Sequence, residues 1–211
     1  ATGEQTGTLD LASVEEVDHA VASSKKAFED WQTVSVAQRT KLLYNFRNLV
    51  EANAEEIARR LTAEHGKVNS DAQGEVARGL ENIEFSCGVS EALKGTYTEH
   101  ASTGVDVYSV RQPLGVCAGI TPFNFPAMVP LWMFPNAVAC GNTFILKPSE
   151  RDPSAPRFIV ELAQEAGFPP GVVNLINGDK VAVDRLLEHS DVKAISFVGS
   201  TPIAKYVYAT G

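Results

Sequence analysis

Residues 115–126 read GVCAGITPFNFP, in which an apolar run ends abruptly at a polar, proline-broken segment. Val116 to Ile120 has the length and composition of a buried strand. A helix-like stretch, residues 126–140, and a second apolar run, residues 143–146, come next. Two short strands separated by a helix of this length predict a parallel pair joined by a right-handed crossover.

The same alternation continues toward the C-terminal end. We expect strands at residues 172–176 and 192–198, helices at 154–166 and 181–189, and a last helix that opens at Ser200 to Pro202. Gly167 is suited to cap the helix before it. Strands that alternate with helices in this way predict an α/β fold with a doubly wound parallel sheet of the Rossmann-like kind.

The first 94 residues have the periodicity of helices. Apolar residues recur at three- and four-residue spacing over residues 13–63, with an interruption near 32–35, and again over about 71–93. Such stripes are typical of helices that pack one face against a core. We interpret this part of the chain as mostly scaffold.

Residues 95–114 change to the period that is typical of strands. They predict a hairpin about the turn Ala101 to Gly104. Because no neighbouring segment is an obvious cover for it, its strand edges are free to pair with another chain. We therefore expect an oligomerisation arm in a homodimer or homotetramer.

Composition excludes several classes of function. The 211 residues contain 18 Lys and Arg against 26 Asp and Glu, a net charge of −8, with no basic run, so nucleic acid is not an expected partner. Cys87, Cys117 and Cys140 show no CxxC spacing and no clustered histidine, which argues against a metal site or a disulfide framework. This usage fits a reducing compartment. We expect the cytoplasm, or the mitochondrial matrix if a transit peptide precedes this sequence.

Residues 112–146 contain no charged side chain and are longer than a membrane-spanning helix needs. An interior proline removes a helical hydrogen bond, and five prolines interrupt the stretch. They are Pro113, Pro122, Pro126, Pro130 and Pro135. We interpret the stretch as the buried core of a soluble protein that has no membrane partner.

Three of the expected strands end in loops with polar or glycine residues, where ligands of parallel sheets bind. Gly199 and Ser200 lead into a helix, whose N-terminal N–H groups suit a pyrophosphate, and Ser200 offers a hydroxyl. The alternative is that Ser200 or Thr201 only caps this helix. No GxGxxG or GxxxxGK[ST] motif is present in the sequence.

Lys147, Glu150 and Arg151 lie at the end of the strand at 143–146. A carboxylate such as Glu150 accepts hydrogen bonds from the hydroxyls of an adenosine ribose and repels a 2′-phosphate, which favours NAD over NADP. Lys147 is placed to reach the same sugar, and Arg151 to lie over the nucleotide. The alternative is a surface Lys–Glu ion pair.

Asn124 is an uncharged double donor between two phenylalanines. Such an amide can stabilise an oxyanion that develops during a reaction. The alternative is that Asn124 caps the helix that begins near Pro126. Cys117 and Cys140 lie within apolar runs, so we expect them to be core residues rather than nucleophiles.

Three segments together resemble the aldehyde dehydrogenase superfamily in their order and spacing. They are Ile120 to Pro126, Gly141 to Arg151, and Phe197 to Ser200. The longer string from Pro122 to Pro135, with Lys147 to Arg151, is most similar to the CoA-acylating branch, that of the methylmalonate-semialdehyde dehydrogenases. The resemblance extends over essentially the whole chain.

The resemblance implies catalytic and nicotinamide-side roles for one loop. Asn124 matches the asparagine whose amide holds the oxyanion. Thr121 and Phe123 match residues whose backbones line the nicotinamide side of the cofactor channel.

The resemblance also implies the remaining cofactor contacts. Lys147 and Glu150 match the pair on the adenosine ribose, Arg151 matches a nucleotide contact of the branch, and Ser200 matches the residue at the pyrophosphate. Residues 1–94 and 115–211 then correspond to an incomplete NAD-binding domain. Residues 95–114 correspond to the bridging hairpin of family oligomers.

The activity that the resemblance implies is NAD-dependent oxidation of methylmalonate or malonate semialdehyde, with coenzyme A as the acyl acceptor. In the family, the catalytic cysteine and a glutamate base come from a segment beyond the position of Gly211. We therefore expect this chain to supply the cofactor-binding part and to be inactive alone. The alternatives are another NAD-dependent semialdehyde dehydrogenase and a non-catalytic nucleotide-binding fragment.

Overall fold

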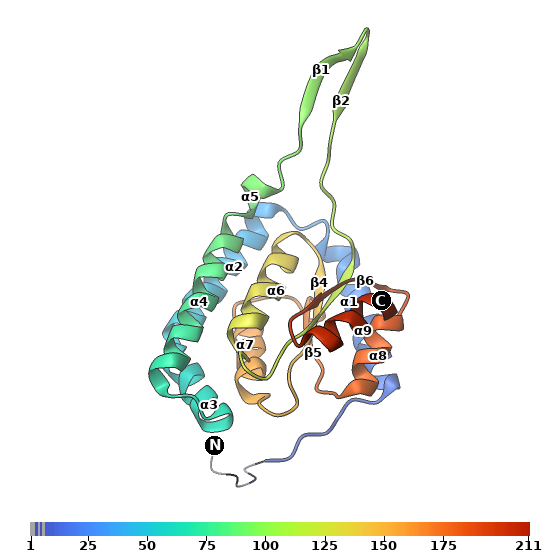
Figure 1. Cartoon of the computed structure of the whole chain (residues 1–211). Helices are drawn as coiled ribbons and strands as arrows, with labels where there is room; N and C mark the ends of the chain where they lie inside the picture. Colours follow the sequence, from blue (N-terminus) through green and yellow to red (C-terminus); the bar gives the residue numbers. More distant parts are fainter. Residues whose placement is uncertain (1–2, 4, 6) are drawn as a thin grey trace.

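A four-stranded parallel sheet forms the centre of the molecule, with helices on both faces (Figure 1). The computed structural model describes Gly3, Gln5 and residues 7–211. The elements are α1 (Val14–Trp31), α2 (Val36–Ala52), α3 (Ala54–His65), α4 (Asn69–Cys87), α5 (Val89–Ala92), β1 (Tyr97–Ser102), β2 (Val105–Tyr108), β3 (Val116–Ile120), α6 (Met128–Ala139), β4 (Thr143–Lys147), α7 (Ser154–Glu165), β5 (Val173–Leu175), α8 (Lys180–Glu188), β6 (Val192–Phe197) and α9 (Thr201–Thr210). Helices α1 and α8 cover one face of the sheet and α6 and α7 the other, where α2, α3 and α4 add a further layer.

The strand order β5-β4-β3-β6 puts the reversal of winding beside β3. From β3 the chain adds β4 and β5 on one side and β6 on the other, always in parallel. Ile120 at the end of β3 is in register with Lys147 of β4 and with Phe197 of β6. The loops after these three strands therefore lie at one edge of the sheet, at a topological switch point.

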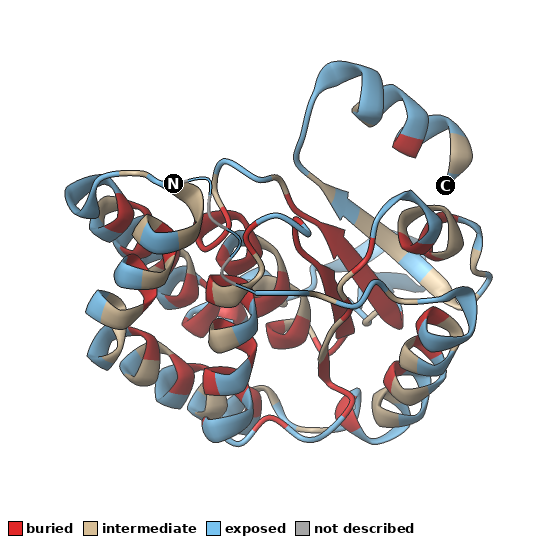
Figure 2. Cartoon of the chain, turned by 90° about the horizontal axis from the view of Figure 1, so that it is seen from below, coloured by how far each residue is buried: buried red, intermediate tan, exposed pale blue. Residues whose placement is uncertain are grey.

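Side chains of the central strands alternate between two cores. Cys117 and Phe144 lie in the larger core with α2, α3, α4, α6 and α7. Val116, Ala118 and Ile145 pack instead with α1 and α8. Figure 2 shows the central strands buried and α9 exposed over most of its length. The α/β fold with a doubly wound parallel sheet, predicted from the sequence, is confirmed.

Helix α6 contains Pro135 in its interior, where proline removes the hydrogen bond to the carbonyl four residues earlier. That carbonyl belongs to Leu131, and the Asn82 side chain of α4 donates to it at 2.7 Å. Gly79 of α4 gives Leu131 room, because a Cβ at residue 79 would collide with the Leu131 side chain. No helix in the described part of the chain, α6 included, is long and apolar enough to cross a membrane.

The N-terminal helices divide at two points that the sequence did not indicate. The stretch expected to be helical up to residue 63 is broken at Asn53. The Asn53 side chain donates back to the carbonyl of Leu49 at 2.8 Å, a local bond that competes with the helical ladder. Gly88 similarly separates α4 from the short α5.

The hairpin predicted for residues 95–114 is present, and it projects from the body of the molecule (Figure 1). Every residue of β1 and β2 is exposed. Ser102 pairs with Val105, so the turn is limited to Thr103 and Gly104 and is tighter than expected.

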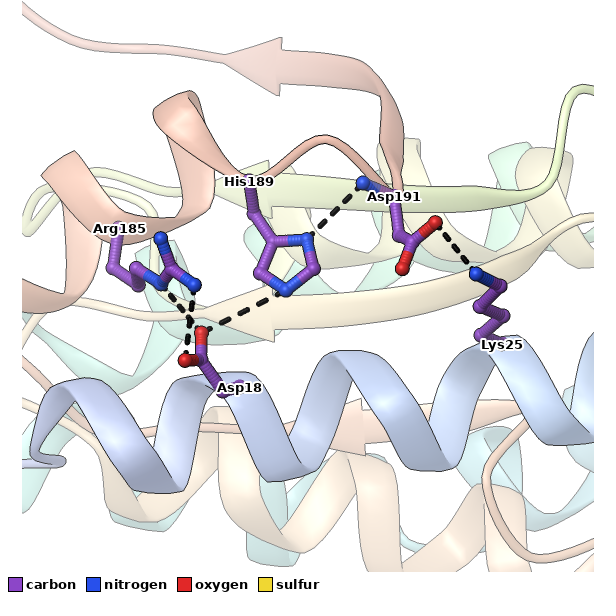
Figure 3. Close-up of polar contacts among 5 residues, drawn as sticks. All are labelled: Asp18, Lys25, Arg185, His189 and Asp191. Carbon is purple, nitrogen blue, oxygen red and sulfur yellow. Dashed lines mark hydrogen bonds and ion pairs between the residues drawn. The ribbon is translucent and has the colours of Figure 1, made fainter.

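Polar contacts join α1 to the turn between α8 and β6 (Figure 3). Arg185 donates to the two Asp18 oxygens at 2.5 and 2.9 Å and holds the pKa of this carboxyl below its ordinary value. His189 Nε2 lies 3.7 Å from Asp18 Oδ1, and His189 Nδ1 accepts from the Asp191 N–H at 3.1 Å. Lys25 pairs with Asp191 at 2.8 Å. These contacts fasten α1 to α8 and to the turn before β6, on the face of the sheet that the two helices cover together.

Candidate functional site

Three loops meet at the carboxyl edge of the sheet. They follow β3 (residues 121–127), β4 (148–153) and β6 (198–200). The Thr121 N–H donates to the Lys147 carbonyl at 3.1 Å, and the Val198 N–H donates to the Ile120 carbonyl at 3.2 Å. These bonds extend the strand pairing beyond β3, so the loops of all the candidate residues begin side by side.

Two candidate residues of the β3–α6 loop differ in exposure. Thr121 is buried, and its hydroxyl has no hydrogen-bond partner among the described residues. Phe123 is 39% exposed, and its ring stacks on His65 with 4.6 Å between the ring centres. Burial lowers the pKa of His65, which favours the neutral imidazole in this stack. The loop thus offers an unused hydroxyl at the switch point and an aromatic ring fixed beside it.

Asn124 does not cap the helix that follows it. Helix α6 begins at Met128, and the Glu75 carboxylate accepts from the backbone N–H groups of Ala127 at 2.8 Å and of Met128 at 3.0 Å. The capping alternative for Asn124 is therefore wrong, because Glu75 has that function. Asn124 is exposed, and within the described residues only its backbone carbonyl is hydrogen-bonded. Its side-chain amide remains free to donate.

Lys67 and Glu75 form a buried ion pair behind this loop. Their side chains are 10% and 1% exposed. Lys67 Nζ also donates to the Asn124 carbonyl at 3.0 Å and lies 4.9 Å from the centre of the Phe125 ring. No motif marks either residue in the sequence, since Lys67 is 57 positions away from Asn124 and only long-range packing brings them together.

Lys147 lies in the core rather than on the surface. Its side chain is 6% exposed, and Nζ donates to the Gly178 carbonyl at 2.9 Å. Burial lowers the pKa of Lys147, while the Glu150 carboxylate, 3.6 Å away, opposes this shift. The Glu150 side chain is 41% exposed. The Lys–Glu pair of the alternative is therefore present, but with Lys147 buried rather than on the surface, and the Glu150 carboxylate is open to an incoming donor.

Arg151 begins the turn into α7. It is exposed, and its N–H donates to the Ser149 hydroxyl at 3.2 Å. Glu150 and Arg151 both line a cavity of about 700 Å³, which residues 7–9 and Asn177 help to enclose. The guanidinium of Arg151 has no ion pair within the described part of the chain, so it is available to a ligand in this cavity.

Ser200 occupies the N-cap position of α9 without acting as a cap. Its backbone is extended there, but its side chain makes no capping hydrogen bond. Position 199 needs a glycine, because a Cβ there would lie 2.5 Å from the Phe197 ring. Both residues are exposed. The Ser200 hydroxyl is therefore unused at the start of the helix, where an anion is favoured.

Neither cysteine next to the sheet is prepared to act as a nucleophile. Cys117 is 7% exposed, and burial raises its pKa to about 11. Burial also raises the pKa of Cys140, although Arg39 opposes the shift. Cys117 is a core residue as expected, whereas Cys140 is half-buried at the end of α6.

Comparison with known proteins covers the whole chain, not only the residues of the site. The model of the aldehyde dehydrogenase family matches residues 1–211. The chain belongs to the aldehyde dehydrogenase family. The resemblance that the three sequence segments indicated is confirmed.

Similar members of this aldehyde dehydrogenase family are semialdehyde dehydrogenases. A malonate-semialdehyde dehydrogenase of Pseudomonas aeruginosa is 53% identical over all of this chain, which spans 42% of that protein. A probable methylmalonate-semialdehyde/malonate-semialdehyde dehydrogenase of Dictyostelium discoideum, described as acylating and mitochondrial, is 51% identical over all of this chain and 40% of its own length. A candidate methylmalonate-semialdehyde dehydrogenase from Sinorhizobium meliloti, solved in complex with NAD, superposes with a TM-score of 0.97 at 53% identity, over 99% of this chain and 43% of that one. The chain thus spans less than half the length of the relatives it matches.

Proposed function

We propose that this chain supplies the cofactor-binding part of an NAD-dependent, CoA-acylating dehydrogenase that oxidises methylmalonate or malonate semialdehyde. The observation that carries the proposal is the Asn124 amide, which is exposed, relieved of helix capping by Glu75 and located at the switch point of the sheet. The names of the similar relatives support the substrate, and the acylating relative supports coenzyme A as acceptor.

The residues at the sheet edge fit NAD. The open carboxylate of Glu150 can accept from the ribose hydroxyls, and the buried ammonium of Lys147 can donate to the same sugar. The unused hydroxyl of Ser200 and the N-terminus of α9 suit the pyrophosphate. The unpartnered hydroxyl of Thr121, with the Phe123 ring beside it, lies at the edge where the nicotinamide end would enter.

Asn124 acts on charge that develops during the reaction. NAD supplies the hydride acceptor when bound, and coenzyme A receives the acyl group after loss of CO₂. The nucleophilic thiolate would come from outside residues 1–211, because Cys87, Cys117 and Cys140 are all at least half-buried and burial raises the pKa of each. The Asn124 amide would donate to the oxyanion that forms when the thiolate adds to the aldehyde.

The hairpin of β1 and β2 supports an oligomeric enzyme. Its two strands are exposed along their whole length and present free edges. We expect it to pair with a sheet of another subunit in a homodimer or homotetramer. Size-exclusion chromatography with light scattering on a chain that lacks residues 96–109 would detect the loss of this contact.

The test of the function uses the longer chain that contains residues 1–211 together with a catalytic segment. Purified enzyme is given NAD and a panel of semialdehydes, with and without coenzyme A, and the formation of NADH and of acyl-CoA is measured. We expect methylmalonate and malonate semialdehydes to be oxidised fastest, in a reaction that requires coenzyme A. Preference for another semialdehyde, or NAD binding without any oxidation, would contradict the proposal. Residues 1–211 alone should form no NADH.

A further inference from the structure

We propose that the buried Lys67–Glu75 ion pair is a positioning element that holds the Asn124 amide where the oxyanion forms. This inference rests on the proposed function of Asn124. Neither residue lies at the sheet edge: Lys67 is in the turn between α3 and α4 and Glu75 is in α4, both in the outer helical layer rather than in the strands and crossovers that form the sheet.

The pair starts from the turn between α3 and α4. Helix α3 ends at Gly66, which has a φ of +88° and turns the chain sharply. Lys67 follows immediately, and its ammonium is directed into the protein, where Glu75 of α4 pairs with it. With side chains 10% and 1% exposed, Lys67 and Glu75 have few alternative contacts with water, which restricts the geometry of the pair.

Glu75 divides its two carboxylate oxygens between the turn and the loop. One oxygen pairs with Lys67, and the other accepts the N–H groups of Ala127 and Met128. A single side chain therefore fixes the start of α6 and the Lys67 ammonium relative to each other.

Lys67 then fixes the residue that matters for the proposed chemistry. Its ammonium donates to the Asn124 carbonyl at 3.0 Å and lies over the Phe125 ring. Phe123, the residue before Asn124, stacks on His65 of α3. Capping α6 requires only Glu75, so the contacts of Lys67 with Asn124 and Phe125 serve a different purpose. They hold the Asn124 backbone while leaving its amide free.

Displacement of this amide should reduce the rate of the reaction rather than the affinity for the cofactor. A catalytic group that moves by about 1 Å can lose on the order of 10²-fold in rate. The Lys67–Glu75 pair does not contact the Glu150 or Ser200 loops in any hydrogen bond of the described residues. Its one link to the Glu150 loop is the charge of Lys67 and Glu75 on buried Asp152, which does not face the cavity, so a change in the pair should leave NAD binding nearly intact.

The experiment compares Lys67→Met with Asn124→Ala and the double variant in the longer, catalytically complete chain. We expect Lys67→Met to lower kcat by about 10- to 100-fold and to change the Kd of NAD by less than about threefold. In the Asn124→Ala background, the same substitution should lower kcat by no more than about twofold, because there is no amide left to displace. Lys25→Met removes an exposed ion pair elsewhere and is the matched control, with unchanged kcat.

A purely structural role for Lys67 predicts a different pattern. The loss of kcat would then be as large in the Asn124→Ala background as in the wild type, and that result would overturn the proposal, as would an unchanged kcat in Lys67→Met. If Lys67→Met does not fold, Glu75→Gln tests the same idea, because the amide oxygen still accepts from α6 while the ion pair is lost. Failure of both variants to fold would assign the pair to folding and also overturn the proposal. A wild-type chain that does not oxidise any semialdehyde contradicts the proposed function instead.

Discussion

The β3–α6 loop and the β6–α9 turn begin at neighbouring positions of the sheet, where Ile120 is in register with Phe197, yet they are held in opposite ways. The first is fixed from α3 and α4 by a ring stack, a buried ion pair and a capping carboxylate. The second is exposed, and its Ser200 makes no capping bond. The comparison indicates that the loop proposed to act on developing charge is preorganised, whereas the turn proposed to receive the cofactor keeps its donors free.

The largest effect should come from the fixed loop itself. In the catalytically complete chain, Asn124→Ala is expected to lower kcat by roughly 10²–10³, because it removes a donor to the oxyanion. The Kd of NAD, measured by isothermal titration calorimetry, should stay within about twofold. Asn48→Ala removes an exposed asparagine of α2 and serves as the control. A parallel loss of NAD affinity and kcat would contradict the distinction between the two regions.

The loop between the two in the chain, β4–α7, should be the pH-sensitive one. Asp152, at the start of α7, is 1% exposed, and burial together with the nearby Glu64 and Glu75 raises its pKa to about 7 from 3.8. Between these values the folded protein holds a proton that the unfolded chain has lost, so stability falls as pH rises from about 4 to 7.

Asp152→Asn removes this titration. Between pH 5 and pH 8 the wild type should lose about 2 kcal/mol more free energy of unfolding than the variant. Urea unfolding at the two pH values checks this, with the exposed Asp30→Asn as control. Equal losses of unfolding free energy in the wild type and in Asp152→Asn would show that another group causes the pH dependence.

An intermediate effect is expected in the β4–α7 loop, which combines the buried Lys147 with the open Glu150. Glu150→Gln should weaken NAD binding by about tenfold, since charged hydrogen-bond acceptors contribute on the order of 1.5 kcal/mol. It should also narrow the preference for NAD over NADP. Steady-state kinetics with both cofactors measure this, and Glu165→Gln at the exposed end of α7, outside the cavity, is the control. Unchanged cofactor preference would show that Glu150 does not contact the ribose.

The smallest effect belongs to the open turn. Ser200→Ala should weaken NAD binding by about two- to threefold and leave the melting temperature unchanged, because no capping bond is lost. Ser13→Ala is the matched comparison, since Ser13 caps α1 in a complete capping box and its loss should cost about 1 kcal/mol. If Ser200→Ala destabilised the protein as much as Ser13→Ala, Ser200 would be a cap after all.

The parts of the structure that sequence could predict are those that depend on local composition. Val116 to Ile120 and the residues that end each strand were recognisable, because buried strands are short apolar runs and their loops are polar. The choice between two roles for Asn124 was not accessible, because it depends on Glu75, which lies 52 positions before Ala127. The break at Asn53 has a different origin, since the Asn53 side chain shares the Leu49 carbonyl with its own backbone N–H, a local bond that no apolar pattern reveals.

Helix α6 depends on α4 at both its beginning and its middle. Glu75 satisfies its first N–H groups, and Asn82 satisfies the carbonyl that Pro135 leaves unpaired, across 49 residues of chain. The two helices should consequently open as a single cooperative unit in hydrogen exchange, and a fluctuation that separates them also frees the β3–α6 loop.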